Sequence, residues 1–285
     1  MTPLTLEAPA KLNLSLRVVR RRDDGYHELD SILVLLDLAD RLLLMPGCSG
    51  LRVTDPEGDP VPGVPVRPDQ NLAWLGLTAG LGGSPDAALA CLTLEKRVPA
   101  AAGLGGGSSD AAAAWRLGRR WIGATDAADQ RDLVAIGADV PFFAAAVPAA
   151  RVGGIGERVT PLDPVAAPST IVLVHPPFAL ATADVFAASR PADWSADAPA
   201  TLDHALAEGG NDLLPAARRV RPEIDDLEAL VLAAGVMPRL TGSGPTFFAV
   251  VDGSDRAVSV IARLARANVR ATASTMRPAA ASIGA

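Results

Sequence analysis

The chain has 285 residues and a formal net charge of −6, which excludes a global basic field of the kind that holds nucleic acid or an anionic membrane surface. We therefore expect neither a nucleic-acid partner nor a membrane partner. Hydrophobic residues make up 49% and charged residues 20%, a balance that allows a large buried core and excludes a disordered chain. Two cysteines, Cys48 and Cys91, are too few for a disulfide framework or a four-cysteine zinc site, and no signal-peptide pattern opens the sequence. These features predict a soluble cytoplasmic protein in a reducing compartment.

The first predicted elements are strands. Leu12, Leu14 and Leu16 alternate with polar neighbours, the period of two that is typical of a strand. The polar segment RRRDDGYHE over residues 20–28 contains Asp-Gly, which indicates a hairpin turn. Residues 31–44 then resume as one or two apolar strands.

The middle of the chain is predicted to alternate loops with single elements. Residues 46–70 are rich in Pro, Gly and Asp and indicate loops with short strands. A helix over 71–81 and a strand over 90–98 follow. The clearest helix covers 108–121, because serine stands at its start and an alanine run follows.

The second half mixes strands and helices without strict alternation, which favours the α+β class. A break rich in Pro and Gly near 148–168 separates it from the first half, so we predict two domains, 1–150 and 151–285. The elements expected in the second half are strands over 170–175, into 242, over 246–251 and over 271–276, and helices over 181–189, 202–206, 222–234 and 256–267.

A glycine-rich loop joins the strand over 90–98 to the helix over 108–121. It reads VPAAAGLGGGSSD, and its glycines let backbone amides approach a ligand closely. Ser108 and Ser109 stand at a helix N-terminus, where free N–H groups favour an anion. A Walker A loop is excluded because Ser108 occupies the place of its lysine, and the dinucleotide motif lacks its third glycine. The loop is predicted to be a phosphate cradle of another type; the alternative is a flexible loop with an ordinary serine N-cap.

Three motifs together resemble the GHMP kinase superfamily. Its central signature, Pro-x-x-x-Gly-Leu-Gly-x-(Gly)-Ser-Ser, is matched from Pro99 to Ser109, and APAKLNLSLRV (8–18) and LTGSGPTFFAV (240–250) match its two other motifs in order. The resemblance implies a two-domain kinase fold, with an N-terminal ribosomal-protein-S5-like domain and a C-terminal ferredoxin-like domain, and ATP as co-substrate accompanied by Mg²⁺. It places these residues at ATP: Asn71, Lys96, Pro99, Ala100, Ala101, Ala102, Gly103, Leu104, Gly105, Gly106, Gly107, Ser108 and Ser109.

Further segments resemble the bacterial isoprenoid branch of that superfamily, which phosphorylates a small molecule carrying a cytidine diphosphate. They are residues 9–32 with the turn DGYHEL, GADVPFF (137–143), NDLLPAA (211–217) and GSGPTFF (242–248). The resemblance implies substrate contacts from Asn13, Tyr26, His27, Thr182 and Phe186.

The physical character of two of these aromatic residues agrees with that role. Tyr26, the single tyrosine, stands in a polar turn, where its ring can stack on a pyrimidine while His27 hydrogen-bonds a base edge. The alternatives are a tyrosine packed under the hairpin and a Phe186 that belongs to a helix core.

Lys11 and Asp139 are the predicted catalytic pair. Each stands in an apolar segment, where a charge is costly to bury without a partner. An ion pair would keep Asp139 ionised and oriented to accept the proton of the acceptor hydroxyl. The alternative is a structural ion pair, and the sequence leaves open whether Asp139 is a base or a positioning group. No residue is assigned to the metal.

Two other functions stay open at this stage. One is another GHMP kinase activity, such as homoserine or phosphomevalonate kinase, and the other is a catalytically silent nucleotide-binding or sensor protein on the same fold. The presence of both Lys11 and Asp139 argues against a silent protein. The sequence also leaves the oligomeric state open, a homodimer included.

Overall fold

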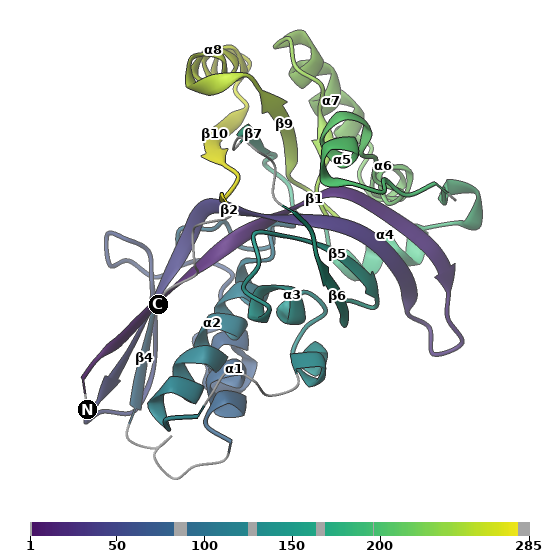
Figure 1. The fold of residues 1–285 in the computed structure, drawn as a ribbon. Coiled ribbons are helices and arrows are strands. Elements are labelled where there is room, and N and C mark those ends of the chain that lie inside the picture. Colours follow the sequence, from purple (N-terminus) through teal and green to yellow (C-terminus); the bar gives the residue numbers. More distant parts are fainter. Residues whose placement is uncertain (1, 83–89, 125–129, 164–168, 196, 279–285) are drawn as a thin grey trace.

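The computed structural model describes residues 2–82, 90–124, 130–163, 169–195 and 197–278. Two β-sheets and the helices packed on them make up this part of the chain, which confirms the α+β class (Figure 1). None of the helices in these ranges combines the length and the apolarity needed to cross a membrane.

The first sheet is built on a long antiparallel hairpin. Strand β1 (Leu4–Arg21) pairs with β2 (His27–Pro46) around the predicted polar turn, and Figure 1 shows this hairpin running from the first sheet to beneath the second half of the chain. The strand order is β3-β4-β2-β5-β6, with β1 paired to β2. The remaining strands are β3 (Gly50–Thr54), β4 (Ala90–Glu95), β5 (Ala149–Gly154) and β6 (Arg158–Pro161).

Strand β1 has the predicted period-two pattern, but neither of its faces is exposed to solvent over residues 8–16. Leu12 and Leu14 pack in a core cluster with Leu173 and Phe248 of the second sheet, as expected for the apolar positions. The polar residues that alternate with these leucines are buried as well: Lys11 is 4% and Asn13 is 6% exposed. The reason is that the strand is covered on both sides, so its polar side chains must find partners inside the protein.

Helices α1 (Leu72–Gly80) and α2 (Gly106–Trp121) pack closely against each other. A Cβ atom on Gly76 would lie 2.1 Å from the carbonyl oxygen of Ala111, so only glycine permits this approach. The sequence-based prediction of both helices is confirmed, although α2 starts two residues before the expected Ser108. Short 3-10 turns lie at Pro68–Gln70, Gln130–Ala135 and Pro191–Asp193.

The second sheet has the antiparallel order β10-β7-β9-β8, which is the strand order of a ferredoxin-like fold. The expected strands are found here, while β8 is only two residues long. The bounds are β7 (Thr170–His175), β8 (Arg239–Leu240), β9 (Phe247–Val251) and β10 (Arg270–Thr275), with helices α4 (Thr182–Ala188), α5 (Leu202–Glu208), α6 (Leu214–Val220), α7 (Glu223–Ala233) and α8 (Gly253–Arg266).

The helices that the sequence pattern did not reveal are short and have proline as their second residue. Helix α3 (Val140–Ala144) and helix α6 each carry a proline in the first turn. Proline is tolerated there because the first amides have no intrahelical acceptor, but it interrupts an apolar periodicity of this length. The predicted domain boundary at 150/151 falls inside β5, and both β5 and β6 belong to the first sheet.

The structure differs from the expectation of two reduced cysteines. Cys48 and Cys91 form a disulfide, with their Cα atoms 5.3 Å apart. They meet because β4 pairs with both β2 and β3, so the turn between those two strands lies beside the start of β4.

Candidate active site

One cavity of about 930 Å³ brings the predicted site residues together. Its wall is formed by β1, the polar turn of the hairpin, the glycine-rich loop, the residues before α3, helix α4 and the loop that follows β8. Every residue predicted to contact ATP or the acceptor, or to carry catalysis, lines this cavity except Ser109. Ser109 is buried in helix α2 instead.

The glycine-rich loop has the geometry expected of an anion cradle. Helix α2 begins at Gly106 with Gly105 as its N-cap, and Gly105 has a φ of +71° that favours glycine. The helix presents its free N-terminal amides to the cavity, which is the arrangement that attracts phosphate. On the other side, a Cβ on Gly103 would lie 2.8 Å from the carbonyl oxygens of Thr241 and Gly244, so two glycine-rich loops are in direct contact.

Lys11 and Asp139 meet in this cavity. The Lys11 Nζ lies 3.5 Å from Asp139 Oδ2, and the lysine is 4% exposed while the aspartate is 34% exposed. Lys11 comes from β1, and Asp139 is the N-cap residue of α3. The partly exposed carboxylate thus faces the cavity with a buried cation behind it, a geometry that allows it to receive a proton from a bound hydroxyl.

A chain of hydrogen bonds fixes the Lys11 ammonium. Its Nζ donates to Asn13 Oδ1 at 2.6 Å, and Asn13 Nδ2 donates to Ser31 Oγ at 2.8 Å. Ser31 Oγ in turn donates to the Ser15 carbonyl at 2.5 Å. Because the amide nitrogen of Asn13 is occupied by Ser31, its oxygen is directed at Lys11. Asn13, expected at the substrate, therefore also positions the lysine.

Lys96, expected near ATP, belongs to a buried ion cluster at the start of α2. Its ammonium donates to Asp40 and, at 2.7 Å, to Asp110 Oδ2. Burial by itself would lower the pKa of Lys96, but the negative charges of Asp110 and Asp40 raise it above its usual value. Burial raises the pKa of Asp110 well above its usual range, against the lowering effect of Lys96. Asp110 Oδ1 and Ser109 Oγ are buried without a hydrogen-bond partner in the protein, and of these two residues only Asp110 lines the cavity.

The end of the cavity formed by the hairpin turn is aromatic. The Tyr26 side chain is 62% exposed and lines the cavity, so it is not packed under the hairpin. The His27 ring lies 5.2 Å from the Phe186 ring and meets Trp194 edge-on at 5.9 Å. Burial, and then the charge of Arg21, lower the pKa of His27, which keeps the imidazole neutral and able to accept or donate a hydrogen bond at pH 7.

The remaining predicted contacts are polar groups with partners inside the protein. Thr182 Oγ1 lies 2.9 Å from Ser243 Oγ, which joins helix α4 to the loop after β8. Asn71 caps helix α1 by accepting from Ala73 N at 2.9 Å, and its amide nitrogen donates to the Pro65 carbonyl at 2.6 Å. Asn71 therefore shapes the cavity wall mainly through the loop and helix that it holds.

Sequence reasoning missed several residues of this site. Asp40 stands in the apolar run over residues 31–44, and a charge in such a run is the signal for a buried partner. Thr241, which accepts from Asn13 N at 3.0 Å, lies within a quoted motif without having been singled out. Trp194 stands in a polar segment that carries no recognisable pattern.

Comparison with known proteins places the chain among kinases of small molecules. The family described as GHMP kinases N terminal domain matches residues 71–147, and that described as GHMP kinases C terminal matches residues 196–270. A curated protein of Paramagnetospirillum magneticum, named 4-diphosphocytidyl-2-C-methyl-D-erythritol kinase, is 39% identical over 94% of this chain and 96% of its own length. A protein of the same name from Thermus thermophilus is 37% identical, with 88% of each chain covered.

Solved structures agree with this result. The crystal structure of a 4-(cytidine 5'-diphospho)-2C-methyl-D-erythritol kinase matches with a TM-score of 0.78 and 36% identity, and covers 95% of this chain and 98% of that one. A homoserine kinase from Cytophaga hutchinsonii shares the fold with a TM-score of 0.68 at 18% identity, covering 97% and 95% of the two chains.

Proposed function

The chain belongs to the GHMP kinases, and we propose from that membership that it transfers the γ-phosphoryl group of ATP to the C2 hydroxyl of 4-diphosphocytidyl-2-C-methyl-D-erythritol. This reaction is a step of the non-mevalonate (methylerythritol phosphate) pathway to isoprenoid precursors. The relatives that carry this substrate in their names match the chain over most of its length.

One observation supports the substrate above all others. A single cavity joins an anion cradle, an ion pair suited to an alcohol and an aromatic end with a neutral histidine. Such a cavity suits an acceptor that carries both a base and an alcohol, with the triphosphate of ATP at the cradle. Homoserine and mevalonate have no base to occupy the aromatic end.

In the proposed mechanism the chain's own residues position the two substrates. The amides at the start of α2 hold the phosphates, and Tyr26 and Phe186 hold the cytosine between aromatic faces with His27 at its edge. Asp139 orients the acceptor hydroxyl and receives its proton, while Lys11 stabilises the carboxylate and the negative charge on the acceptor oxygen. Phosphoryl transfer depends mainly on such positioning and charge stabilisation.

We propose that Mg²⁺ enters with ATP. Among the described residues, no group of three or more His, Cys, Asp or Glu could hold a metal ion on its own. This suits Mg²⁺, which is usually bound through phosphate oxygens, waters and one or two protein oxygens. The unpartnered Asp110 Oδ1, on a residue that lines the cavity, is a suitable protein oxygen. When bound, the ion neutralises the charge of the transferring phosphoryl group.

Product analysis tests the proposal. The protein is incubated with Mg·ATP and 4-diphosphocytidyl-2-C-methyl-D-erythritol, and the product is identified by ³¹P NMR and mass spectrometry. We expect a new phosphomonoester at C2, and no turnover of homoserine or mevalonate. Comparable turnover of homoserine would refute the assignment, and no turnover of any of these alcohols would favour a silent nucleotide-binding protein. The cytoplasmic location, the absence of a nucleic-acid partner and the homodimer remain predictions.

A further inference from the structure

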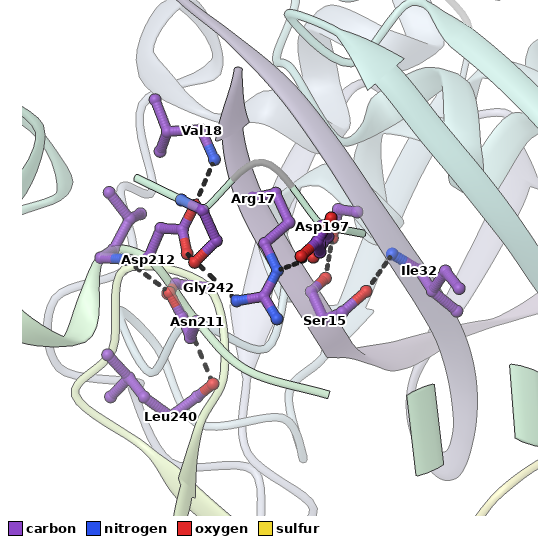
Figure 2. A network of polar contacts seen from close by, with 12 residues as sticks. Ser15, Arg17, Val18, Ile32, Asp197, Asn211, Asp212, Leu240 and Gly242 are labelled. Atoms are coloured by element: carbon purple, nitrogen blue, oxygen red, sulfur yellow. Dashed lines mark hydrogen bonds and ion pairs between the residues drawn. The ribbon is translucent and has the colours of Figure 1, made fainter. Parts of the chain in front are cut away.

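Two adjacent polar residues, Asn211 and Asp212, lie just outside the cavity between β1 and the loop that follows β8. Neither residue lines the cavity wall, yet each makes several hydrogen bonds to elements that do (Figure 2). Asp212 is only 3% exposed. A buried carboxylate and an amide with several hydrogen bonds, both beside the cavity, indicate that these two side chains hold neighbouring elements in place.

Asn211 holds the loop after β8. Its Nδ2 donates to the Leu240 carbonyl at 2.9 Å and to the Gly242 carbonyl at 2.8 Å, while its Oδ1 accepts from Leu213 N at 2.9 Å. Figure 2 shows Asn211 beside Leu240 and Gly242. The amide nitrogen thus donates twice to the backbone that leads into the second glycine-rich loop, and the amide oxygen is held by the backbone of the Asn211 segment itself.

The position of Gly242 matters for the catalytic lysine. A Cβ atom on Gly242 would lie 3.2 Å from Lys11 Nζ and 3.2 Å from the Gly103 carbonyl. This backbone segment therefore packs directly on the ammonium and on the phosphate cradle. Any shift of Gly242 changes the space in which Lys11 and the phosphates are held.

Asp212 makes contacts of a different kind. Its carboxylate accepts from Val18 N at 2.9 Å and from Arg17 at 3.1 Å, both on β1. It also accepts from the backbone N and from the Oγ of Ser195, each at 2.9 Å. Asp212 thus ties the segment around Ser195 to the strand that leads into the hairpin turn.

The segment held by Asp212 supports the aromatic end of the cavity. Trp194 directly precedes Ser195, meets the His27 ring edge-on, and donates from Nε1 to Ser189 Oγ at 2.9 Å. His27 in turn contacts Phe186, which lines the cavity. The carboxylate of Asp212 therefore reaches the base-binding end through Ser195 and Trp194, and it has no contact with Lys11.

We propose that Asn211 and Asp212 are positioning residues with separate tasks: Asn211 fixes the glycine loop against Lys11 and the phosphate cradle, and Asp212 fixes the aromatic wall that receives the acceptor's base. The inference rests on the proposed kinase function. Asn211 would then affect the transfer step and Asp212 the binding of the acceptor, although the two residues are consecutive in the chain.

The test compares isosteric variants by steady-state kinetics. Asn211→Asp keeps the shape of the side chain but directs a carboxylate at two carbonyl oxygens. We therefore expect kcat to fall by about tenfold to 10²-fold, which is the usual cost of a small displacement at a reacting centre. The KM for the acceptor should change little. Asp212→Asn replaces an acceptor oxygen by a donor, so we expect the acceptor KM to rise by about tenfold with little change in kcat. Binding of cytidine diphosphate, measured by calorimetry, should weaken only in Asp212→Asn.

Matched controls and milder variants separate positioning from folding. Asn268→Asp and Asp226→Asn make the same chemical changes at exposed sites and should leave both constants unchanged. Asn211→Ser retains one donor, and Ser195→Ala removes one donor from Asp212, so each should show a weaker form of the same effect in a folded protein. All rates are normalised to the folded fraction from circular dichroism.

The outcomes are distinct. If the wild type phosphorylates the acceptor and both variants lower kcat and raise KM in the same proportion, or change neither, the two residues are merely structural and the inference is wrong. If the wild type does not phosphorylate the acceptor, the proposed function fails. In that case, weaker cytidine diphosphate binding in Asp212→Asn alone still supports the positional part of the inference, and equal binding in all variants overturns it.

Discussion

Exchanging Lys11 for arginine is the most informative single change, because it keeps the positive charge and alters only the shape of the cation. The structure leaves little room for the larger head group. Lys11 is 4% exposed, its Nζ is 2.6 Å from Asn13 Oδ1, and a Cβ on Gly105 would already lie 2.9 Å from Lys11 Cγ. The backbone at Gly242 closes the space above the ammonium.

Two costs follow from this packing. Overfilling a close-packed site destabilises a protein by about 1–3 kcal/mol, so we expect the free energy of unfolding to fall by that amount. The guanidinium must also push Asn13 or Asp139 aside, and a displacement of about 1 Å at a reacting centre costs about 10² in rate. We therefore expect Lys11→Arg to lower kcat by about 10²-fold, equivalent to about 2.7 kcal/mol in the activation barrier.

The assay is a coupled measurement of ADP release with Mg·ATP and the cytidine-bearing acceptor, paired with urea denaturation. Arg67→Lys serves as the control for exchanging the two cations, because Arg67 is 69% exposed. The reasoning is refuted if Lys11→Arg folds normally and keeps kcat within about threefold of the wild type, since the site would then need only a positive charge.

Three further predictions address other parts of the molecule. Asp139→Asn should lower kcat by about 10²–10⁴-fold with little change in ATP affinity, because the proton acceptor is lost while the phosphate cradle stays intact. Tyr26→Ala should raise the acceptor KM, since a base–aromatic contact is worth about 1–3 kcal/mol. Burial, and then Arg270, lower the pKa of His175 from 6.5 to about 4. Between these values the unfolded chain binds the proton that the folded one excludes, so stability should fall by up to about 3 kcal/mol as the pH drops from 6.5 to 4.

Each of these three has a clear contrary result. Near-normal turnover in Asp139→Asn would make the ion pair structural. An unchanged acceptor KM in Tyr26→Ala would place the base elsewhere. For His175, urea denaturation of His175→Gln at pH 7 and pH 4.5 should show a smaller loss of stability than the wild type. An equal loss in both proteins would assign the acid sensitivity to other groups, and the exposed His204→Gln serves as the control.

Sequence reasoning located two parts of the candidate site, one from residues contiguous in the chain and one from the cost of burying a charge. The strand, the glycine loop and the helix start are contiguous, so their combination predicts the phosphate cradle directly. Lys11 and Asp139 were paired from the cost of burying each charge in an apolar segment, and the structure places them 3.5 Å apart. The same reasoning applied to Asp40 would have indicated its buried partner Lys96.

It failed where a residue's role depends on long-range packing. The alternation in β1 predicts one apolar face, but nothing local reveals that Asn13 and Ser15 on the other face are buried too. Asn211 and Asp212 entered only as part of a resemblance, because their partners lie up to 195 positions away in the chain. The contacts of Trp194 likewise form only when the segment after α4 packs against the hairpin turn.

The contact between Asn13 N and Thr241 Oγ1 joins residues 228 positions apart. Strand β1, which carries Lys11, is made early in synthesis relative to the loop after β8, which completes the surroundings of that lysine. Closing such a long loop costs conformational entropy, which is offset only when the contacts between β1 and the loop after β8 have formed. The cavity is therefore complete only after the loop that follows β8 has been made: a nascent chain that stops before β8 lacks Gly242 and Ser243, which form part of the wall beside Lys11.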